Sequence, residues 1–165
     1  MNPTLQGLPP VIGSQTRLVV LGSFPGVASL NAGQYYGHPR NHFWPLLSAI
    51  WGVDLMSLTY AQRLEQMHGH GLGLWDVYAS CRRQGSLDSA IRQARRNDLG
   101  GLLQRAPQLQ AVAHNGGESA RATRHTLALG VAVLILPSTS PANASWSFDR
   151  KLSSWCAAFV QHGVA

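Results

Sequence analysis

The chain has 165 residues, of which 45% are apolar and 12% are charged, and this length suits one domain with a single hydrophobic core. Thirteen basic residues against seven acidic ones give a net charge of +6 at pH 7, which argues against an acidic solvating protein and favours a polyanionic partner. All the basic residues except Lys151 are arginines, whose planar guanidinium pairs with phosphate through two hydrogen bonds, although a GC-rich genome would produce the same bias.

The positive charge is concentrated after residue 80, because the first 80 residues carry three basic and three acidic residues. Within the second half, five arginines share a short stretch in which Asp88 is the only acid: Arg82, Arg83, Arg92, Arg95 and Arg96. This cluster is either the solvated face of a helix or a surface that binds phosphate.

The cysteine count limits metal and redox chemistry. Cys81 and Cys156 are too few for a four-cysteine zinc or iron–sulfur site, and neither belongs to a C-x-x-C pair. The chain begins with no signal-peptide pattern, and no apolar run reaches the roughly 18 residues of a membrane span. We therefore expect a cytoplasmic monomer with reduced cysteines, no metal, no cofactor and no membrane contact.

The first half predicts two strands and two helices. Residues 1–16, rich in Pro, Gly and polar residues, predict an irregular lead-in, and 17–21 then reads as a short buried strand. The polar loop 22–41 that follows is long, and long loops in compact domains usually carry function. The spacing of apolar residues next predicts helices over 43–51 and 59–67, and 71–78 reads as a second strand.

The second half continues this alternation. We expect strands over 109–114 and 131–136 and helices over 86–96, 98–105, 117–128 and 149–162. Alternating strands and helices predict one α/β domain over 1–165, a three-layer α/β/α sandwich with a central four-stranded parallel sheet. The reactive loops of such a sheet follow the carboxyl ends of its strands, which points to loops 22–41, 114–117 and 137–144.

The loop that begins G-S-F-P-G at Gly22 matches no dinucleotide-binding, Walker or nucleophile-elbow pattern. Its glycines and serines suit close approach by a ligand. Tyr35 and Tyr36 then add aromatic rings that either stack on a base or simply pack.

Two further stretches carry polar side chains next to predicted elements. In H-P-R-N-H the proline between His38 and His42 argues against a zinc site, and Asn41 either caps the following helix or holds a water or a base edge. The stretch P-S-T-S-P-A-N over 137–143 is stiffened by two prolines, so it is either a plain turn or a rigid wedge against DNA.

These motifs together resemble the uracil-DNA glycosylase superfamily, and most of all its hypoxanthine-DNA (deoxyinosine) glycosylase branch, which is related to the mismatch-specific uracil-DNA glycosylases. The matching blocks extend from Leu21 to about Trp155. They are L-G-S-F-P-G-V-A-S-L, Q-Y-Y-G-H-P-R-N-H-F-W, G-L-W-D-V followed by S-L-D-S-A-I, H-N-G and L-P-S-T-S-P-A-N-A.

The resemblance implies hydrolysis, without metal or cofactor, of the N-glycosidic bond of a deaminated base flipped out of double-stranded DNA. Hypoxanthine is the expected base, with xanthine and uracil as further candidates. By position the resemblance makes Asn41 catalytic and Tyr36 the ring that stacks on the base. It also implies that the first motif faces the flipped nucleotide, namely Gly22, Ser23, Phe24, Pro25 and Gly26.

The second motif of the superfamily grips the DNA backbone and corresponds to Ser138, Thr139, Ser140, Pro141, Ala142 and Asn143. We also expect His38 and Asn115 to contact the base, and Arg40, Arg82 and Arg83 to contact DNA.

The chain departs from the superfamily pattern in two places. Phe24 occupies the position at which efficient uracil-excising members place an Asn or Asp that orients the water. The second motif contains no histidine, so leaving-group activation must rely on other groups. These departures keep a second hypothesis open, a catalytically silent nucleic-acid-binding domain with the same fold.

Overall fold

The computed structural model describes residues 2–165 and contains a four-stranded parallel sheet in the order β3-β2-β6-β7. Its strands are β2 (Leu18–Gly22), β3 (Leu72–Asp76), β6 (Ala111–Asn115) and β7 (Ala132–Leu136). Residues on β2, β3 and the inner part of β6 are almost entirely buried, as expected of parallel strands covered on both faces. The predicted four-stranded parallel sheet is confirmed.

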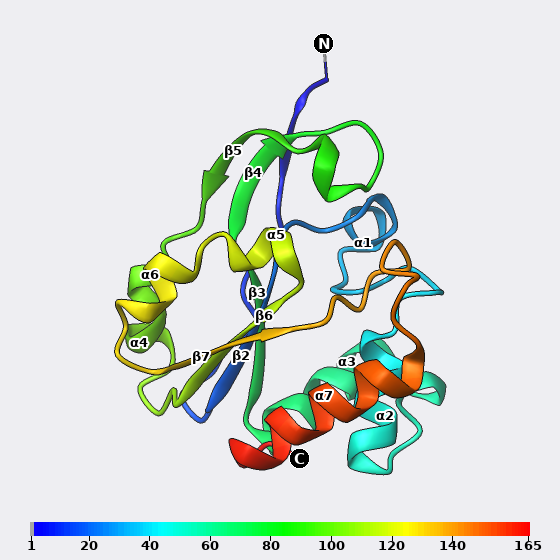
Figure 1. The fold of residues 1–165 in the computed structure, drawn as a ribbon, viewed down its shortest axis with the longest axis vertical. Helices are drawn as coiled ribbons and strands as arrows, with labels where there is room; N and C mark the ends of the chain where they lie inside the picture. Colours follow the sequence, from blue (N-terminus) through cyan, green and yellow to red (C-terminus); the bar gives the residue numbers. More distant parts are fainter. Residues whose placement is uncertain (1) are drawn as a thin grey trace.

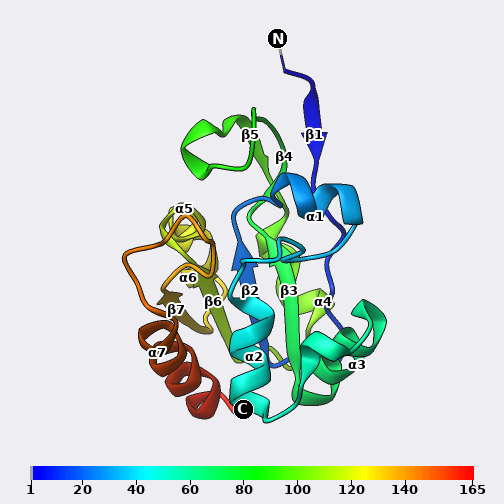
Figure 2. The ribbon, with the colours of Figure 1, turned by 90° about the vertical axis from the view of Figure 1, so that its right-hand side faces the viewer.

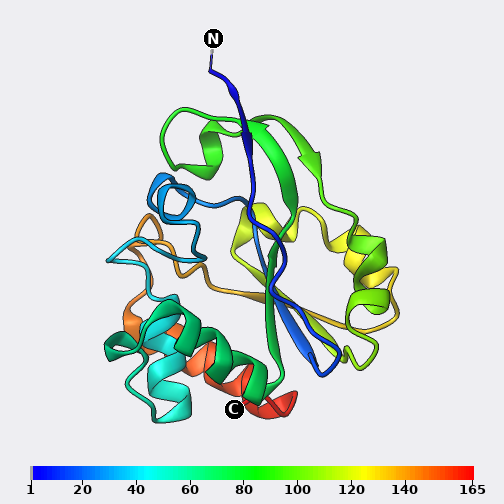
Figure 3. The same cartoon turned by 180° about the vertical axis from the view of Figure 1, so that it is seen from behind.

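Helices cover both faces of this sheet (Figure 1, Figure 3). One face carries α2 (Phe43–Trp51), α3 (Tyr60–His70) and α7 (Phe148–Gln161), which lie side by side in Figure 2. The other face carries α4 (Leu102–Arg105), α5 (Gly117–Ala120) and α6 (Thr123–Leu127). Leu18 and Val20 point to the first group, and Val19 and Leu21 to the second, because successive side chains of a strand alternate between faces.

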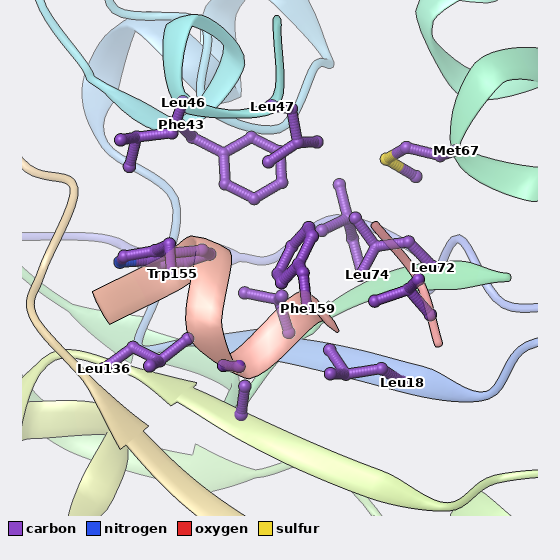
Figure 4. Close-up of a cluster of buried hydrophobic side chains, with 14 of the residues drawn as sticks. Leu18, Phe43, Leu46, Leu47, Met67, Leu72, Leu74, Leu136, Trp155 and Phe159 are labelled. Carbon is purple, nitrogen blue, oxygen red and sulfur yellow. The ribbon is translucent and has the colours of Figure 1, made fainter. Parts of the chain in front are cut away.

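Aromatic packing fixes α7 against α2 and the sheet (Figure 4). The Trp155 ring is fully buried, with its centroid 6.0 Å from those of both Phe43 and Phe159. Its indole N–H donates to the carbonyl of Pro137 at 2.9 Å, which satisfies the only polar atom of the ring. The core therefore holds the first residue of the loop that follows β7.

A second, antiparallel sheet in the order β1-β4-β5 was not expected from the sequence. It consists of β1 (Thr4–Gln6), β4 (Tyr78–Arg82) and β5 (Arg92–Arg96). The predicted helix over 86–96 is wrong: the segment contains only the short 3₁₀ turn η2 (Asp88–Ala90) and then β5. All five β5 residues are exposed, so pairing with β4 rather than burial of an apolar face determines their conformation.

Smaller differences concern boundaries. The predicted strand over 71–78 is divided, because the chain leaves β3 after Asp76 and enters the second sheet at Tyr78. The predicted helix over 117–128 is broken into α5 and α6. The lead-in contains β1, and the loop 22–41 contains α1 (Val27–Ala32).

The other predicted helices and strands are present with small shifts in their ends. The predicted helix over 98–105 is a 3₁₀ turn, η3 (Leu99–Gly101), continued by α4, and another 3₁₀ turn, η1 (Leu55–Ser57), precedes α3. Within residues 2–165, no helix has both the length and the apolar character needed to cross a membrane.

Replacement of Trp155 by Ala should lower the free energy of unfolding by about 3–5 kcal/mol, because it empties a fully buried site and removes the bond to Pro137. Urea denaturation followed by circular dichroism at 222 nm measures the change. Val160→Ala, on the exposed side of the same helix, should stay within about 0.5 kcal/mol of the parent. Equal effects of the two substitutions would contradict this account of the core.

Candidate functional site

A cavity of about 820 Å³ opens at the carboxyl edge of the parallel sheet. The loops after β2, β6 and β7 form its walls, as expected for an open α/β sheet. The loop 137–143 and the segment before α2, which both line the cavity, lie side by side (Figure 1, Figure 3). The cavity brings together the following predicted residues: Gly22, Ser23, Phe24, Pro25, Gly26, Tyr36, His38, Asn41, Asn115, Ser138, Thr139, Ser140, Pro141, Ala142 and Asn143.

Gly22 is the point at which two walls of the cavity meet. It pairs in register with Asp76 at the ends of β2 and β3. A Cβ atom at this position would collide with the Asp76 carboxyl and would come within 3.3 Å of the Tyr36 hydroxyl. The absence of a side chain at residue 22 is therefore a steric requirement of the site.

Arg83 is buried and contacts the first motif, residues 22–26. Only 4% of its surface is exposed, and its guanidinium lies 5.3 Å from the centroid of the Phe24 ring. Its Nη2 and Nε donate to the carbonyls of Pro25 and Gly85. The expectation that Arg83 contacts DNA is therefore wrong. Its guanidinium is buried and holds the loop 22–26 through the carbonyl of Pro25.

The loop 86–89 also lines the cavity and is called its rim below. It is anchored on both sides, because Ser86 Oγ accepts from the backbone N–H of Val27 at 2.9 Å and Asp88 accepts from Ser23 Oγ at 2.6 Å. Leu87, between these anchors, is 58% exposed. The rim therefore has a fixed backbone that carries an exposed apolar side chain.

Tyr36 adopts a left-handed backbone conformation, with φ of 55°, which is uncommon for a residue other than glycine. Its ring stacks on Phe43, with centroids 4.1 Å apart and planes inclined by 23°. Burial and the nearby Asp76 raise the pKa of its hydroxyl, so the group is neutral. Phe43 therefore covers one face of the ring, and Tyr36 also lines the cavity.

The Asn115 amide ties three segments of the site together. Its Nδ2 donates to the Tyr36 hydroxyl at 3.2 Å and to Thr139 Oγ1 at 3.0 Å, and its Oδ1 accepts from the Thr139 backbone N–H at 3.0 Å. Both N–H groups are thus used within the protein. Asn115 lines the cavity, and its hydrogen bonds to Thr139 fix the loop after β7.

Asn41 lies between the cavity and the start of α2. Its Oδ1 accepts from the backbone N–H of Phe43, the first residue of α2, at 2.9 Å, which is an Asx turn, whereas the N-cap position of α2 is held by His42 without a side-chain cap bond. The same side chain lines the cavity, and within residues 2–165 its Nδ2 has no hydrogen-bond partner. The amide is therefore held in one orientation with donors left for a ligand.

His38 and Arg40 belong to the segment before α2. Both are exposed, and the His38 ring accepts from the Arg40 backbone N–H at 3.0 Å. His38 lines the cavity, whereas the Arg40 side chain does not.

Asp76 belongs to the cavity wall and was missed by sequence reasoning. It is 4% exposed, and its Oδ2 is buried without a hydrogen-bond partner in the described part of the chain. Burial raises the pKa of Asp76 to about 7, assisted by the negative charge of Asp88 and opposed by Arg83. The signal in the sequence was an acidic residue closing the apolar strand G-L-W-D.

Comparison with known proteins identifies the family of this chain. Residues 9–161 match the model of the Uracil DNA glycosylase superfamily. The chain belongs to this superfamily. Two curated relatives carry the name hypoxanthine DNA glycosylase, one from Methanosarcina barkeri with 42% identity and one from Methanosarcina acetivorans with 35%. Each matches over 154 residues, which are 93% of this chain and 97% of the relative.

The fold of this superfamily member is also shared with a solved structure. The solution NMR structure of a candidate uracil DNA glycosylase from Methanosarcina acetivorans superposes with a TM-score of 0.87 at 34% identity. The match covers 96% of this chain and 98% of that one. The resemblance stated from the motifs is thereby confirmed at the level of family and fold.

Three arginines of this glycosylase-superfamily chain form an exposed row on the edge strand β5, namely Arg92, Arg95 and Arg96. Arg95 and Arg96 also line a shallow groove of about 410 Å³ on the small sheet, together with Thr4 and Gln6. Arg82 lies opposite Arg92 on β4 and is half-buried. Within residues 2–165, no three His, Cys, Asp or Glu side chains gather closely enough to hold a metal ion.

Replacement of Asn115 by Ala should loosen the loop 137–143, because Thr139 loses both its acceptor and its donor. We expect the free energy of unfolding to fall by about 1–3 kcal/mol and amide exchange at Thr139 to accelerate. Hydrogen exchange followed by mass spectrometry measures the second effect. Gln104→Ala, on the exposed side of α4, is the control and should leave this loop unchanged. Unaltered exchange in the Asn115 variant would show that other contacts hold the loop.

Proposed function

We propose that this protein is a DNA glycosylase that hydrolyses the N-glycosidic bond of hypoxanthine in a deoxyinosine nucleotide extruded from double-stranded DNA. The observation that carries the proposal is the single cavity in which both superfamily motifs, Tyr36 and Asn41 converge. Its volume of about 820 Å³ falls in the range of small-molecule sites and suits one nucleotide. The two relatives named hypoxanthine DNA glycosylase support this choice of base, and xanthine and uracil are further candidate substrates.

The chemistry requires a site that tolerates charge on both sides of the breaking bond. As the bond between sugar and base lengthens, positive charge develops on the sugar and negative charge on the base. Fixed hydrogen-bond donors near the base stabilise this distribution more than they stabilise the ground state. The amide of Asn41 and the neutral hydroxyl of Tyr36 are such groups, and neither needs to change its protonation state.

Asn41 is the residue that we propose as catalytic. Its Oδ1 is oriented by the N–H of Phe43 and keeps one lone pair, while Nδ2 remains a donor. An amide held in this way can position the attacking water or bind the departing base. Phe24, which is 6% exposed and packs against Arg83, has no polar atom for either task.

The loop 137–143 is proposed to occupy the gap left by the extruded base and to contact the DNA backbone. Its position is fixed by Trp155 at Pro137, by Asn115 at Thr139 and by the backbone N–H of His42, which donates to the Thr139 carbonyl at 2.9 Å. A loop that is rigid before binding loses little conformational entropy when DNA arrives. Arg40, Arg82 and the β5 arginines are the proposed phosphate contacts.

The decisive experiment mixes purified protein with a duplex that contains one deoxyinosine and then cleaves abasic sites with alkali. Strand breaks at the deoxyinosine support the proposed activity. Absence of breaks with deoxyinosine, deoxyxanthosine and deoxyuridine duplexes, combined with retained DNA binding, would instead favour the catalytically silent domain.

Asn41→Ser should slow single-turnover excision of hypoxanthine by about 100-fold, because the amide is lost. The serine hydroxyl can still accept from the Phe43 N–H, so the melting temperature should change little. Asn31→Ala, on the exposed surface of α1, is the matched control and should retain the parent rate. A rate for Asn41→Ser close to that of the parent would leave Asn41 only its structural bond to the Phe43 N–H.

Simultaneous replacement of Arg95 and Arg96 by Gln should weaken binding to any duplex. Each lost phosphate contact should reduce the slope of log affinity against log salt by about 0.9. Fluorescence anisotropy over a series of salt concentrations measures the slope. Arg63→Gln, on α3 at the opposite end of the molecule, should leave it unchanged (Figure 1). An unchanged slope in the double variant would mean that these arginines face solvent only.

A further inference from the structure

The block S-L-D-S over 86–89, which forms the rim, has no role in the proposed hydrolysis. The side chains of Ser86 and Asp88 are bonded to the segment that follows β2, and the Leu87 carbonyl accepts from the Ala90 N–H at 3.1 Å. These bonds fix the backbone on both sides of Leu87. The protein therefore holds a large apolar side chain at a defined place in the cavity wall and leaves it exposed.

A single exposed leucine is ordinary on a protein surface, but Leu87 has an apolar neighbour. Val27 is also exposed and lines the same cavity, and its backbone N–H donates to Oγ of Ser86, the residue before Leu87. Two large apolar side chains are thus exposed on one wall of the cavity. Contact with water is unfavourable for both, so a partner that covers them gains the free energy of their burial.

The charge beside the rim indicates which kind of partner covers it. Arg92 donates through Nη1 to the carbonyls of Ser89 and Ile91, both at 2.8 Å, which places an exposed guanidinium next to the rim. An apolar side chain beside an arginine suits double-stranded DNA, whose stacked bases are apolar and whose backbone is anionic. An apolar protein surface would desolvate this charge without pairing it.

The loop of the second motif leaves room for a further contact of this kind. Within 137–143 no apolar side chain is larger than proline. Extrusion of a nucleotide opens a gap the size of a base in the stack, and proteins that stabilise such gaps insert apolar wedges, leucine among them. Pro141 and Ala142 fill a gap of this size only in part, so a larger side chain from another wall of the cavity can enter it.

We propose that Leu87 inserts into the base stack beside the extruded nucleotide and replaces part of the stacking that the duplex loses. The inference rests on the proposed function and names a residue that keeps the target nucleotide extruded. Leu87 is then a DNA-binding residue that does not touch the reacting atoms. Because its backbone is fixed before DNA arrives, insertion costs little conformational entropy.

The test compares excision of hypoxanthine from double-stranded and from single-stranded DNA. A single strand has no duplex stack to hold the nucleotide, so little stacking has to be replaced there. Leu87→Ala should slow single-turnover excision from the duplex by about tenfold and leave the rate on the single strand within about twofold of the parent. Leu87→Met keeps the size and the apolar character of the side chain, so it should retain the parent rate on both substrates.

Leu127→Ala is the matched control, because Leu127 is exposed on α6 and does not line the cavity. It should keep both rates, and the melting temperatures of all these variants should equal that of the parent. Two outcomes would overturn the inference. One is a parent rate on the duplex for Leu87→Ala. The other is equal slowing on duplex and single strand, because Leu87 would then shape the cavity and not the stack.

A binding measurement separates this inference from catalysis. In the Asn41→Ser background, a duplex with 2-aminopurine next to the deoxyinosine should fluoresce more strongly on binding, because the fluorescent base loses its stacked neighbour. Addition of Leu87→Ala should reduce this rise by about half or more. No rise, or an equal rise in both proteins, would refute the role of Leu87 and leave the glycosylase proposal to the excision assay. A Leu87-dependent rise in a protein whose parent cleaves no duplex would contradict the proposed function and support the inference.

Discussion

The site depends on a missing side chain at Gly22. Because β2 ends in glycine, the Asp76 carboxyl can occupy the space in which a Cβ atom would lie, and the Tyr36 hydroxyl can lie 3.3 Å from that position. Tyr36 then meets Asn115, and Asn115 meets Thr139. Hydrogen bonds thus connect Tyr36, through Asn115, with the loop after β7.

The sheet and the two layers of helices position the loops that form the cavity. The carboxyl ends of parallel strands lie at the same edge of a sheet, so the loops that follow these strands lie close together. The two helical layers then hold the loops from behind: Trp155 of α7 bonds to Pro137, and α2 presents its first N–H to Asn41. Rigidity of the cavity is therefore a property of the core as much as of the loops.

The sequence was informative wherever burial on both faces left an apolar run. The strand over 17–21 was predictable for this reason. The strand over 131–136 is equally apolar although it lies at the edge of the sheet with Ile135 63% exposed, and the final helix was predictable from the helical spacing of its apolar residues. The helix expected over 86–96 failed because all residues of β5 are exposed, and their conformation depends on antiparallel pairing with β4 across the loop 83–91, which the composition of 86–96 alone does not reveal. The residues of the cavity were found through the motifs and the resemblance, whereas Arg83 was misplaced and Asp76 was missed, because the burial of a charge depends on the tertiary fold.

The exposed strand β5 has a consequence for self-association. An open strand edge offers unpaired backbone groups on which another chain could add a strand and begin to aggregate. Arginine at positions 92, 95 and 96 places like charges along this edge, so that the same edge of a second copy is repelled. Substitutions that neutralise these three arginines would therefore remove this repulsion. Concentrated protein would then be more prone to pair β5 of one copy with β5 of another.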